Sequence, residues 1–279
     1  MRNLASKNRV ETVVRARPFL KWAGGKTQLL PKILQRFPEN FNRYHEPFVG
    51  GGAVFFNLEP RSCTLSDINA DLVTTYTALR DDVDGVIENL KQHRAEEAYY
   101  YSVRDEMVSG LSETEAAARI IFLNRTCFNG LYRVNRSGKF NVPFGRYANP
   151  TICNEANLRA VSEALQDVKI RHESVFQIGR RVRRGDLVYF DPPYDPISKT
   201  ASFTAYAKGG FGDAEQERLA QLFRRFAERG VHVVLSNSDT PFIRSLYKDF
   251  RIDKVYARRA INSRADRRGP VGEVLVSSC

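Results

Sequence analysis

Short β-branched and aromatic runs alternate with helical patterns along most of the chain, and this alternation restricts the fold more than any other feature of the sequence. A regular alternation of strands and helices builds a sheet that is covered by helices on both faces. The sequence therefore predicts one doubly wound α/β domain with a seven-stranded sheet. The runs that we assign to strands are 44–49, 63–67, 168–173, 186–190, 231–236, 250–257 and 273–278.

The segment 70–153 interrupts this alternation between the second and third strands. Its pattern is helical through 88–107 and 112–126, and then turn residues dominate from 128 to 147, where Gly, Asn and Ser are typical of a β-hairpin. A chain of 279 residues is long enough for a core domain with an insertion. We expect residues 70–153 to form an inserted domain, and residues 1–69 and 154–279 to form the two parts of the main domain.

Positive charge is concentrated in this insertion. The chain has a formal net charge of +11, and surplus positive charge on a soluble protein favours polyanionic partners. Between 119 and 147 there are six basic residues and no acidic one, interleaved with aromatic side chains. Cations meet phosphates while aromatic rings stack on or insert between bases, so we expect the turn-rich region to bind nucleic acid. For the arginine-rich segment 258–270, both a phosphate contact and a solvated loop stay open.

The cysteines and the apolar runs indicate the compartment. Cys63, Cys127, Cys153 and Cys279 show no metal-ligand spacing, and no stretch has the pattern of a signal peptide or a membrane span. We expect a reduced, cytoplasmic protein that binds no metal, and we expect it to be monomeric. The first ten residues are expected to form a flexible basic arm.

Two glycine-rich segments bear on cofactor binding. The segment 21–27, KWAGGKT, ends like a phosphate-binding loop, but Leu20 stands where such a loop needs glycine, which argues against an ATPase. The glycines at 50–52 follow the first strand and precede a helical pattern, so a ligand can approach the backbone there. Asp67 ends the second strand, where a carboxylate can accept hydrogen bonds from ribose hydroxyls; the alternative is a helix-capping aspartate. Together the turn and the acid predict a nucleoside-type cofactor.

The motif DPPY at 191–194 directly follows a strand that should be buried. Its two prolines lack N–H donors and have a fixed φ, so the carbonyls beside them are held rigidly outside the sheet. Asp191 and the Pro192 carbonyl can accept both hydrogens of an exocyclic amino group while Tyr194 stacks on the ring. The alternative is a turn that proline merely stiffens.

Six sequence blocks carry a resemblance to a known family: KWAGGK, EPFVGGG, SDIN, NGLYRVN with GKFNVPFGRY, DPPY and LSNSDT. They occur in the order found in DNA adenine-N6 methyltransferases of the GATC-methylating Dam type, and the chain resembles this family from 18 to 276. The resemblance implies a Rossmann-like methyltransferase sheet, S-adenosylmethionine as cofactor, double-stranded DNA as partner and an adenine, flipped out of the duplex, as target.

The resemblance also implies roles for individual residues, with segment 21–26 as a lid on the methyl donor. The cofactor-binding positions correspond to Trp22, Lys26, Phe48, Gly50, Gly52, Asp67 and Asp191. The catalytic positions correspond to Asp191, Pro192 and Tyr194. The DNA-binding positions correspond to Lys21, Arg104, Phe128, Asn129, Leu131, Arg133, Asn135, Asn141, Pro143, Arg146 and Tyr147. Among these, Phe128 would insert into the duplex, Arg133 would read a guanine and Arg104 would contact a phosphate.

Two other functions stay open at this point. A methyltransferase acting on cytosine N4 or on an RNA base needs a similar amino-group site, and a DNA-binding homologue can keep the fold without activity. Asp191 as the first motif residue and the recognition block favour adenine in DNA. The presence of Lys26, Asp67 and Tyr194 favours an active enzyme, and both a solitary enzyme and the partner of a restriction endonuclease fit this description.

Overall fold

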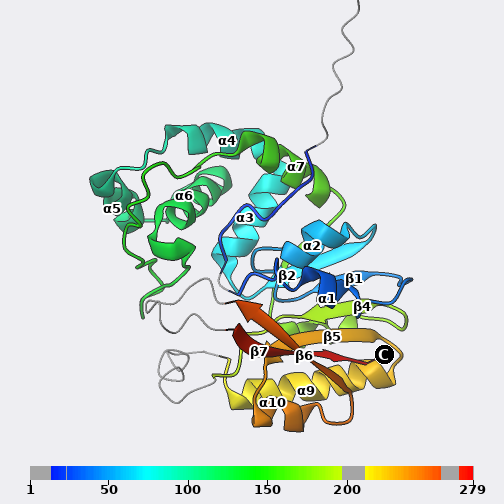
Figure 1. Ribbon diagram of the computed structural model, residues 1–279. Helices are drawn as coiled ribbons and strands as arrows, with labels where there is room; N and C mark the ends of the chain where they lie inside the picture. Colours follow the sequence, from blue (N-terminus) through cyan, green and yellow to red (C-terminus); the bar gives the residue numbers. More distant parts are fainter. Residues whose placement is uncertain (1–13, 23, 197–210, 259–269, 279) are drawn as a thin grey trace, which may run out of the picture.

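The computed structural model describes residues 14–22, 24–196, 211–258 and 270–278 (Figure 1). The predicted basic arm at 1–10 and the segment 259–269 lie outside these residues. All seven predicted strands form, and they join one sheet in the order β3-β2-β1-β4-β5-β7-β6, so the predicted fold class is confirmed. The strands are β1 (Tyr44–Glu46), β2 (Cys63–Asp67), β3 (Lys169–His172), β4 (Leu187–Phe190), β5 (His232–Ser238), β6 (Arg251–Arg258) and β7 (Pro270–Ser277).

The strand order reverses between β1 and β4. Strand β1 pairs in parallel with both β2 and β4, and β4 pairs in parallel with β5. Strand β7 is antiparallel to its neighbours β5 and β6. Open α/β sheets bind ligands outside the carboxyl ends of the strands where the order reverses. The ends of β1, β2, β4 and β5 therefore define the edge at which a site is expected.

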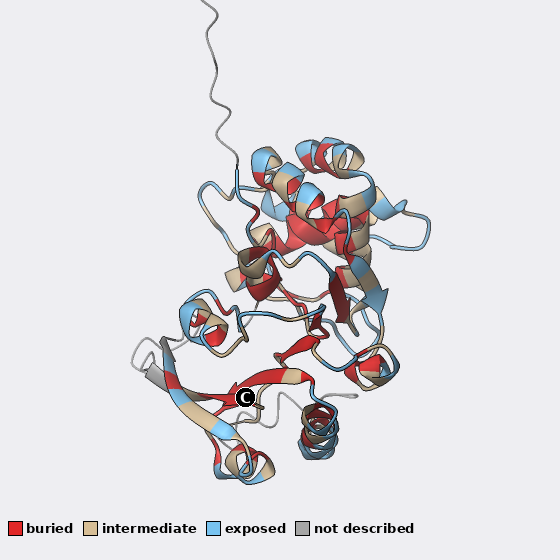
Figure 2. Ribbon diagram, turned by 90° about the vertical axis from the view of Figure 1, so that its right-hand side faces the viewer, coloured by how far each residue is buried: buried red, intermediate tan, exposed pale blue. Residues whose placement is uncertain are grey.

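Each central strand is buried on both faces. Along β4, Leu187 and Tyr189 join one apolar cluster, whereas Val188 and Phe190 join the other. The first cluster lies under α1 (Leu30–Leu34), α2 (Ala53–Leu58), α3 (Ala70–Asp81) and α7 (Glu155–Leu165). The second lies under η2 (Val175–Arg180), α9 (Asp213–Glu228) and α10 (Pro241–Leu246). Figure 2 shows the buried residues running along the strands, which explains their nearly continuous apolar runs.

The helices of the insertion extend the first cluster away from the sheet. Helices α4 (Val83–Gln92), α5 (Glu97–Asp105) and α6 (Glu113–Thr126) lie beyond α3, at the upper left of Figure 1. Helix α6 begins with a capping box in which Ser112 and Glu115 bind each other's backbone N–H groups, and it is buried along most of its length. The same apolar cluster includes residues of β1, α3 and α6, so one core supports both the sheet and the insertion.

The turn-rich region after α6 forms the predicted hairpin, although in irregular form. It starts with η1 (Phe128–Gly130) and is joined by two antiparallel bridges, Cys127 with Phe144 and Val134 with Phe140. The Asn135 N–H donates to the Lys139 carbonyl at 2.8 Å, which closes the tip. The segment is thus held by isolated bridges instead of a continuous ladder.

Candidate active site

The centre of the site is an ion pair between two segments that are far apart in the sequence. Asp191 follows β4 directly, and its Oδ1 lies 2.9 Å from Lys26 Nζ. Lys26 also donates a hydrogen bond to the Gly24 carbonyl at 2.5 Å, and its ammonium lies 4.7 Å from the centroid of the Tyr194 ring. Only 5% of Lys26 is exposed, and a buried ammonium requires such partners. The structure thus brings the lysine of KWAGGK against the DPPY motif.

A second hydrogen bond orients the Asp191 carboxylate. The Ser236 hydroxyl, on β5, donates to Asp191 Oδ1 at 2.8 Å and is itself 2.8 Å from the Tyr189 hydroxyl. Burial raises the pKa of Asp191, and the Lys26 cation opposes that rise. Among the described residues both of these partners bind Oδ1, and neither binds Oδ2.

Glu46 is a buried acid at the end of β1 that the sequence analysis did not single out. Tyr44, two residues earlier on the same strand face, donates a hydrogen bond to Glu46 Oε2 at 2.9 Å. The pKa of Glu46 is raised to about 8, chiefly by burial and also by the nearby charge of Asp191, while the Tyr44 hydrogen bond opposes the rise. Glu46 is therefore mostly protonated at neutral pH, so Lys26 and Asp191 set the charge of this region.

The glycine turn and Asp67 meet as predicted from their positions after adjacent strands. The Gly50 N–H donates to Asp67 Oδ2 at 3.2 Å, and the Asn69 N–H donates to Oδ1 at 3.0 Å. Burial raises the pKa of Asp67, and these N–H donors oppose the rise. The cap of α3 is Asn69, whose side chain accepts from the Leu72 N–H. The capping interpretation of Asp67 is therefore wrong.

The turn needs glycine because neighbouring rings approach its backbone closely. Gly50 and Gly52 have φ angles of 47° and 68°, in the left-handed region. A Cβ at Gly50 would lie 2.8 Å from Trp22 Cδ1, and one at Gly52 would lie 2.6 Å from the Tyr76 hydroxyl oxygen. Trp22 in turn stacks on Tyr132 of the hairpin, with ring centroids 5.3 Å apart. Trp22 thus lies between the glycine turn and the insertion.

Phe48 belongs to a small aromatic group beside this turn. Its ring contacts those of Phe211 and Phe190 edge-on, with centroids 5.6 Å and 6.5 Å apart. Phe211 stacks on Phe176, and the Arg218 guanidinium lies 4.0 Å from the Phe176 centroid. The sequence did not single out Phe176 or Phe211, because an isolated phenylalanine is most often a core residue.

Some of the predicted DNA contacts form pairs on the hairpin. Arg133 donates from Nε to Asn141 Oδ1 at 2.7 Å and from Nη2 to the Asn141 carbonyl at 3.1 Å. Lys21 Nζ lies 4.3 Å from the centroid of the Tyr147 ring. Phe128 is 47% exposed, which is unusual for a phenylalanine. The structure therefore holds two predicted base-reading cations beside other predicted contacts and presents Phe128 to solvent.

The remaining predicted DNA contacts have other local partners. Asn135 uses its side-chain oxygen to accept the Ser137 and Lys139 N–H groups, and Pro143 accepts the Phe128 N–H at 2.8 Å. Leu131 is half-buried against the first apolar cluster. Asn129 has a φ of 57°, a conformation that Asn tolerates. Two arginines form ion pairs with acids, Arg146 with Glu97 and Arg104 with Asp105.

Asn124, on α6, joins the lid segment to the hairpin. Its Oδ1 accepts the Lys21 N–H at 2.7 Å, and its Nδ2 donates to the carbonyls of Lys21 and Gly130 at 2.7 Å and 3.0 Å. Only 1% of Asn124 is exposed. In the sequence, Asn124 stands out only as a polar residue among the apolar positions of α6, which does not indicate its partners.

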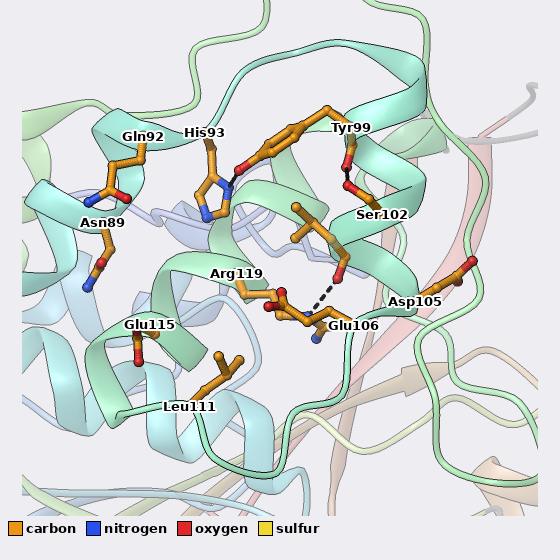
Figure 3. A pocket seen from close by; sticks show the side chains of 11 residues that line it. Asn89, Gln92, His93, Tyr99, Ser102, Asp105, Glu106, Leu111, Glu115 and Arg119 are labelled. Atoms are coloured by element: carbon orange, nitrogen blue, oxygen red, sulfur yellow. Dashed lines mark hydrogen bonds between the residues drawn. The ribbon is translucent and has the colours of Figure 1, made fainter.

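A separate cavity of about 530 Å³ lies within the insertion, between α4, α5 and α6 (Figure 3). None of the predicted site residues lines it. The buried Arg119 beside it donates to the Val103 and Arg104 carbonyls, and the His93 ring stacks on Phe122. These polar groups are therefore used to hold the helices together.

Metal and membrane sites were sought over the described ranges. Residues 14–22, 24–196, 211–258 and 270–278 contain no group of three or more His, Cys, Asp or Glu side chains arranged to hold a metal ion. None of the helices in these ranges combines the length and the apolar composition that a membrane span requires.

Comparison with known proteins assigns the chain to a family. The family model for D12 class N6 adenine-specific DNA methyltransferases matches residues 22–261. The Type II methyltransferase M1.LlaDCHI of Lactococcus lactis subsp. cremoris is 42% identical over 284 residues, 99% of each chain. The Type II methyltransferase M.MjaIII of Methanocaldococcus jannaschii is 46% identical and covers 90% of this chain and 95% of its own. The DNA adenine methylase of Escherichia coli K12 is 37% identical over 93% of this chain and 94% of its own. The chain therefore belongs to the D12 class of N6 adenine-specific DNA methyltransferases.

Proposed function

We propose that this enzyme transfers a methyl group from S-adenosylmethionine to N6 of an adenine that is flipped out of duplex DNA, within the sequence GATC. The observation that carries the proposal is the cluster of Lys26, Asp191 and Tyr194 beside the turn bound by Asp67. An acceptor pair for an amino group and a cradle for a nucleoside then lie at one sheet edge.

The residues of the turn fit the cofactor. Gly50 and Gly52 have positive φ angles and leave room for Trp22 and Tyr76 against the turn, so glycine lets the chain reverse tightly at the end of β1. Asp67 offers a half-buried carboxylate that can accept hydrogen bonds from ribose hydroxyls. Trp22, Lys26 and Phe48 lie around this region. When bound, S-adenosylmethionine supplies an electrophilic methyl group on a sulfonium, without the help of a metal.

The protein residues are assigned the task of orienting the target amine toward the methyl group. The N6 amine is a poor nucleophile while its lone pair is conjugated with the adenine ring. Asp191 Oδ2 and the Pro192 carbonyl each accept one N6 hydrogen, which favours a pyramidal nitrogen with its lone pair toward the methyl group. With the donor bound, the N–C bond would form as the donor's C–S bond broke, and Asp191 would be placed to take the extra proton from N6. Tyr194 stacks on the base, and the fixed geometry supplies much of the rate.

We assign recognition of DNA to the insertion, residues 70–153, within which the hairpin contacts the bases. Flipping a base costs a few kcal/mol of stacking and pairing, and the exposed Phe128 can fill the gap that it leaves. The Arg133 guanidinium, oriented by Asn141, can bond both acceptors of a guanine. Lys21, beside Tyr147, supplies a second base-reading cation. The other residues assigned to DNA are Arg104, Asn129, Leu131, Asn135, Pro143 and Arg146.

The test is a single-turnover assay with radiolabelled S-adenosylmethionine on a GATC duplex, its single-base variants, a duplex with cytosine at the target position, and the matching RNA. We expect fast transfer to GATC and slower transfer to every other substrate. Equal rates on GATC and its variants would remove the GATC assignment and leave adenine methylation intact. Binding of the duplex without any transfer would identify an inactive homologue.

A further inference from the structure

The DPPY loop is held from outside by side chains of β5, α9 and β7. The block LSNSDT forms the end of β5 and the turn after it. Ser236 binds Asp191, and the Tyr194 hydroxyl donates to Glu273 Oε2 on β7 at 2.7 Å. Farther along, Ser238 donates to the Asp195 carbonyl at 2.6 Å. The loop is therefore attached at its acid, at its aromatic ring and at its end.

Two buried amides complete this attachment in the middle of the loop. Gln216, on α9, donates from Nε2 to the Pro193 carbonyl at 2.9 Å, and its Oε1 accepts from Asn237 Nδ2 at 3.0 Å. Asn237 Oδ1 accepts the N–H groups of Asp195 and Ser238 at 3.1 Å and 2.8 Å. Gln216 is 1% exposed and Asn237 is fully buried. Both amides are therefore hydrogen-bonded, as buried polar groups must be, and the pair links α9 and β5 to the loop.

The direction of this chain of hydrogen bonds follows from its backbone partners. Because two N–H donors point at one end of Asn237, that end must be its oxygen, and its nitrogen must face Gln216. Gln216 then turns its oxygen to Asn237 and its nitrogen to the Pro193 carbonyl. The prolines lack N–H donors, so a carbonyl is the only backbone group by which the middle of the loop can be held.

We propose that Gln216 and Asn237 are positioning residues for methyl transfer: they hold the Pro193 carbonyl and thereby aim the Pro192 carbonyl at the target amine. Among the described residues none donates a hydrogen bond to the Pro192 carbonyl, so this oxygen is the one left for a substrate. The inference rests on the proposed role of the DPPY loop. It gives a function to a helix residue and to a motif that have no direct contact with a substrate.

The experiment uses the full-length enzyme with a saturating GATC duplex and S-adenosylmethionine. Gln216→Met keeps the side-chain volume but removes both the donor to the Pro193 carbonyl and the acceptor for Asn237. Gln216→Glu removes the donor and keeps the acceptor. We expect both to lower the single-turnover rate about tenfold to a hundredfold, because a misplaced acceptor is costly. The dissociation constants for cofactor and duplex should stay within about twofold of wild type, because a positioning residue acts on the transfer step and touches neither ligand.

Two further variants separate positioning from stability. Asn237→Asp keeps the acceptor for both N–H groups, so it should fold while slowing transfer, and combining it with Gln216→Met should cost no more than Gln216→Met alone. Asn157→Ala is the matched control, because Asn157 is another buried amide that binds backbone on both sides, at Arg17. It should lower the melting temperature and leave the transfer rate unchanged.

The inference fails if Gln216→Met transfers at the wild-type rate, or if this variant is slow only because it binds the cofactor more weakly. It also fails if the rate losses of Gln216→Met and Asn237→Asp multiply in the double variant, since two residues acting through one contact should not be independent. Asp191→Ala in the same assay distinguishes this failure from failure of the proposed function. If Asp191→Ala is inactive while the Gln216 variants are fully active, only the positioning role is wrong. If Asp191→Ala is active, the assignment of the loop itself is wrong.

Discussion

The ammonium of Lys26 and the carboxylate of Asp191 lie 2.9 Å apart and largely out of contact with water. The cation assigned to the methyl donor and the anion assigned to the target amine therefore neutralise each other in one buried site. Neither can be removed without leaving the other as an unpaired buried charge, which is costly.

Asp191→Ala is expected to abolish methyl transfer, because the acceptor for the amine and the counter-ion of Lys26 are both lost. Asp191→Asn should cause a large loss without full abolition, since the amide oxygen still accepts a hydrogen bond. Single-turnover rates measure both effects. Duplex binding, measured by fluorescence anisotropy, should survive in both variants, and an Asp191→Ala enzyme with near wild-type rate would contradict the catalytic role.

Asp67→Ala is expected to weaken binding of S-adenosylmethionine by roughly 1–3 kcal/mol, the value of a hydrogen bond to a charged acceptor. Calorimetric titration measures the change. Asn69→Ala is the neighbouring control, because it removes the cap of α3 and should lower stability while leaving cofactor affinity unchanged. Equal affinities of Asp67→Ala and wild type would exclude a ribose contact.

Arg133→Ala is expected to relax discrimination at a single base pair of the target, at a cost of roughly 1–3 kcal/mol there. Asn141→Ala should have a weaker effect in the same direction, because it removes the side-chain acceptor of the Arg133 guanidinium and keeps the backbone carbonyl that accepts the second hydrogen bond. Transfer rates on GATC and on its single-base variants provide the readout. Equal slowing on every duplex would mean that Arg133 binds phosphate instead.

Phe128→Ala should preserve the sequence preference and slow base flipping, because the gap left in the stack is no longer filled. The fluorescence of 2-aminopurine at the target position reports flipping directly. Val134→Ala offers a control at another exposed apolar residue of the hairpin. If Phe128→Ala changes sequence preference but not the flipping signal, the residue reads bases instead of filling the gap.

Glu46→Gln is expected to change how stability depends on pH. The folded pKa of Glu46 is about 8 against an ordinary value of 4.5. Between these values the folded protein holds a proton that the unfolded chain releases, so wild type loses stability as pH rises from 4.5 to 8. Asp67 and Asp191 act in the same direction in both proteins. Urea unfolding should therefore show the stability of Glu46→Gln relative to wild type increasing with pH, and a constant difference would contradict the assignment.

The strands could be predicted from the sequence because burial on both faces leaves a local signal, a short apolar run bounded by turns. Gly50 and Asp67 could be placed at one site because parallel strands end at the same sheet edge. Glu46, Gln216 and Asn124 could not be predicted. Each is a polar residue on a strand or helix whose partners lie on other elements, so its role exists only after the chain has folded.

Within the hairpin, too, the sequence could not predict which polar groups bind each other. Its turn residues indicated where the chain reverses, but not which polar groups the turn itself would use. Asn135 resembles a DNA contact, yet its side-chain oxygen already accepts two N–H groups of the turn. Tyr132 gave no separate signal, and its stacking on Trp22 depends on how the insertion packs against the sheet.

Asn124 links the proposed lid, segment 21–26, to the hairpin by hydrogen bonds. A single amide holds the backbone of Lys21, next to Trp22, and the backbone of Gly130, next to the hairpin. If segment 21–26 shifts around a bound donor, as the proposed lid role implies, it must displace the segment to which we assign base reading or break these bonds. Because coupling between two ligands is reciprocal, any gain in duplex affinity that the donor produces through Asn124 is matched by an equal gain in donor affinity on cognate DNA. Sequence recognition would then reach the methyl donor as well as the adenine.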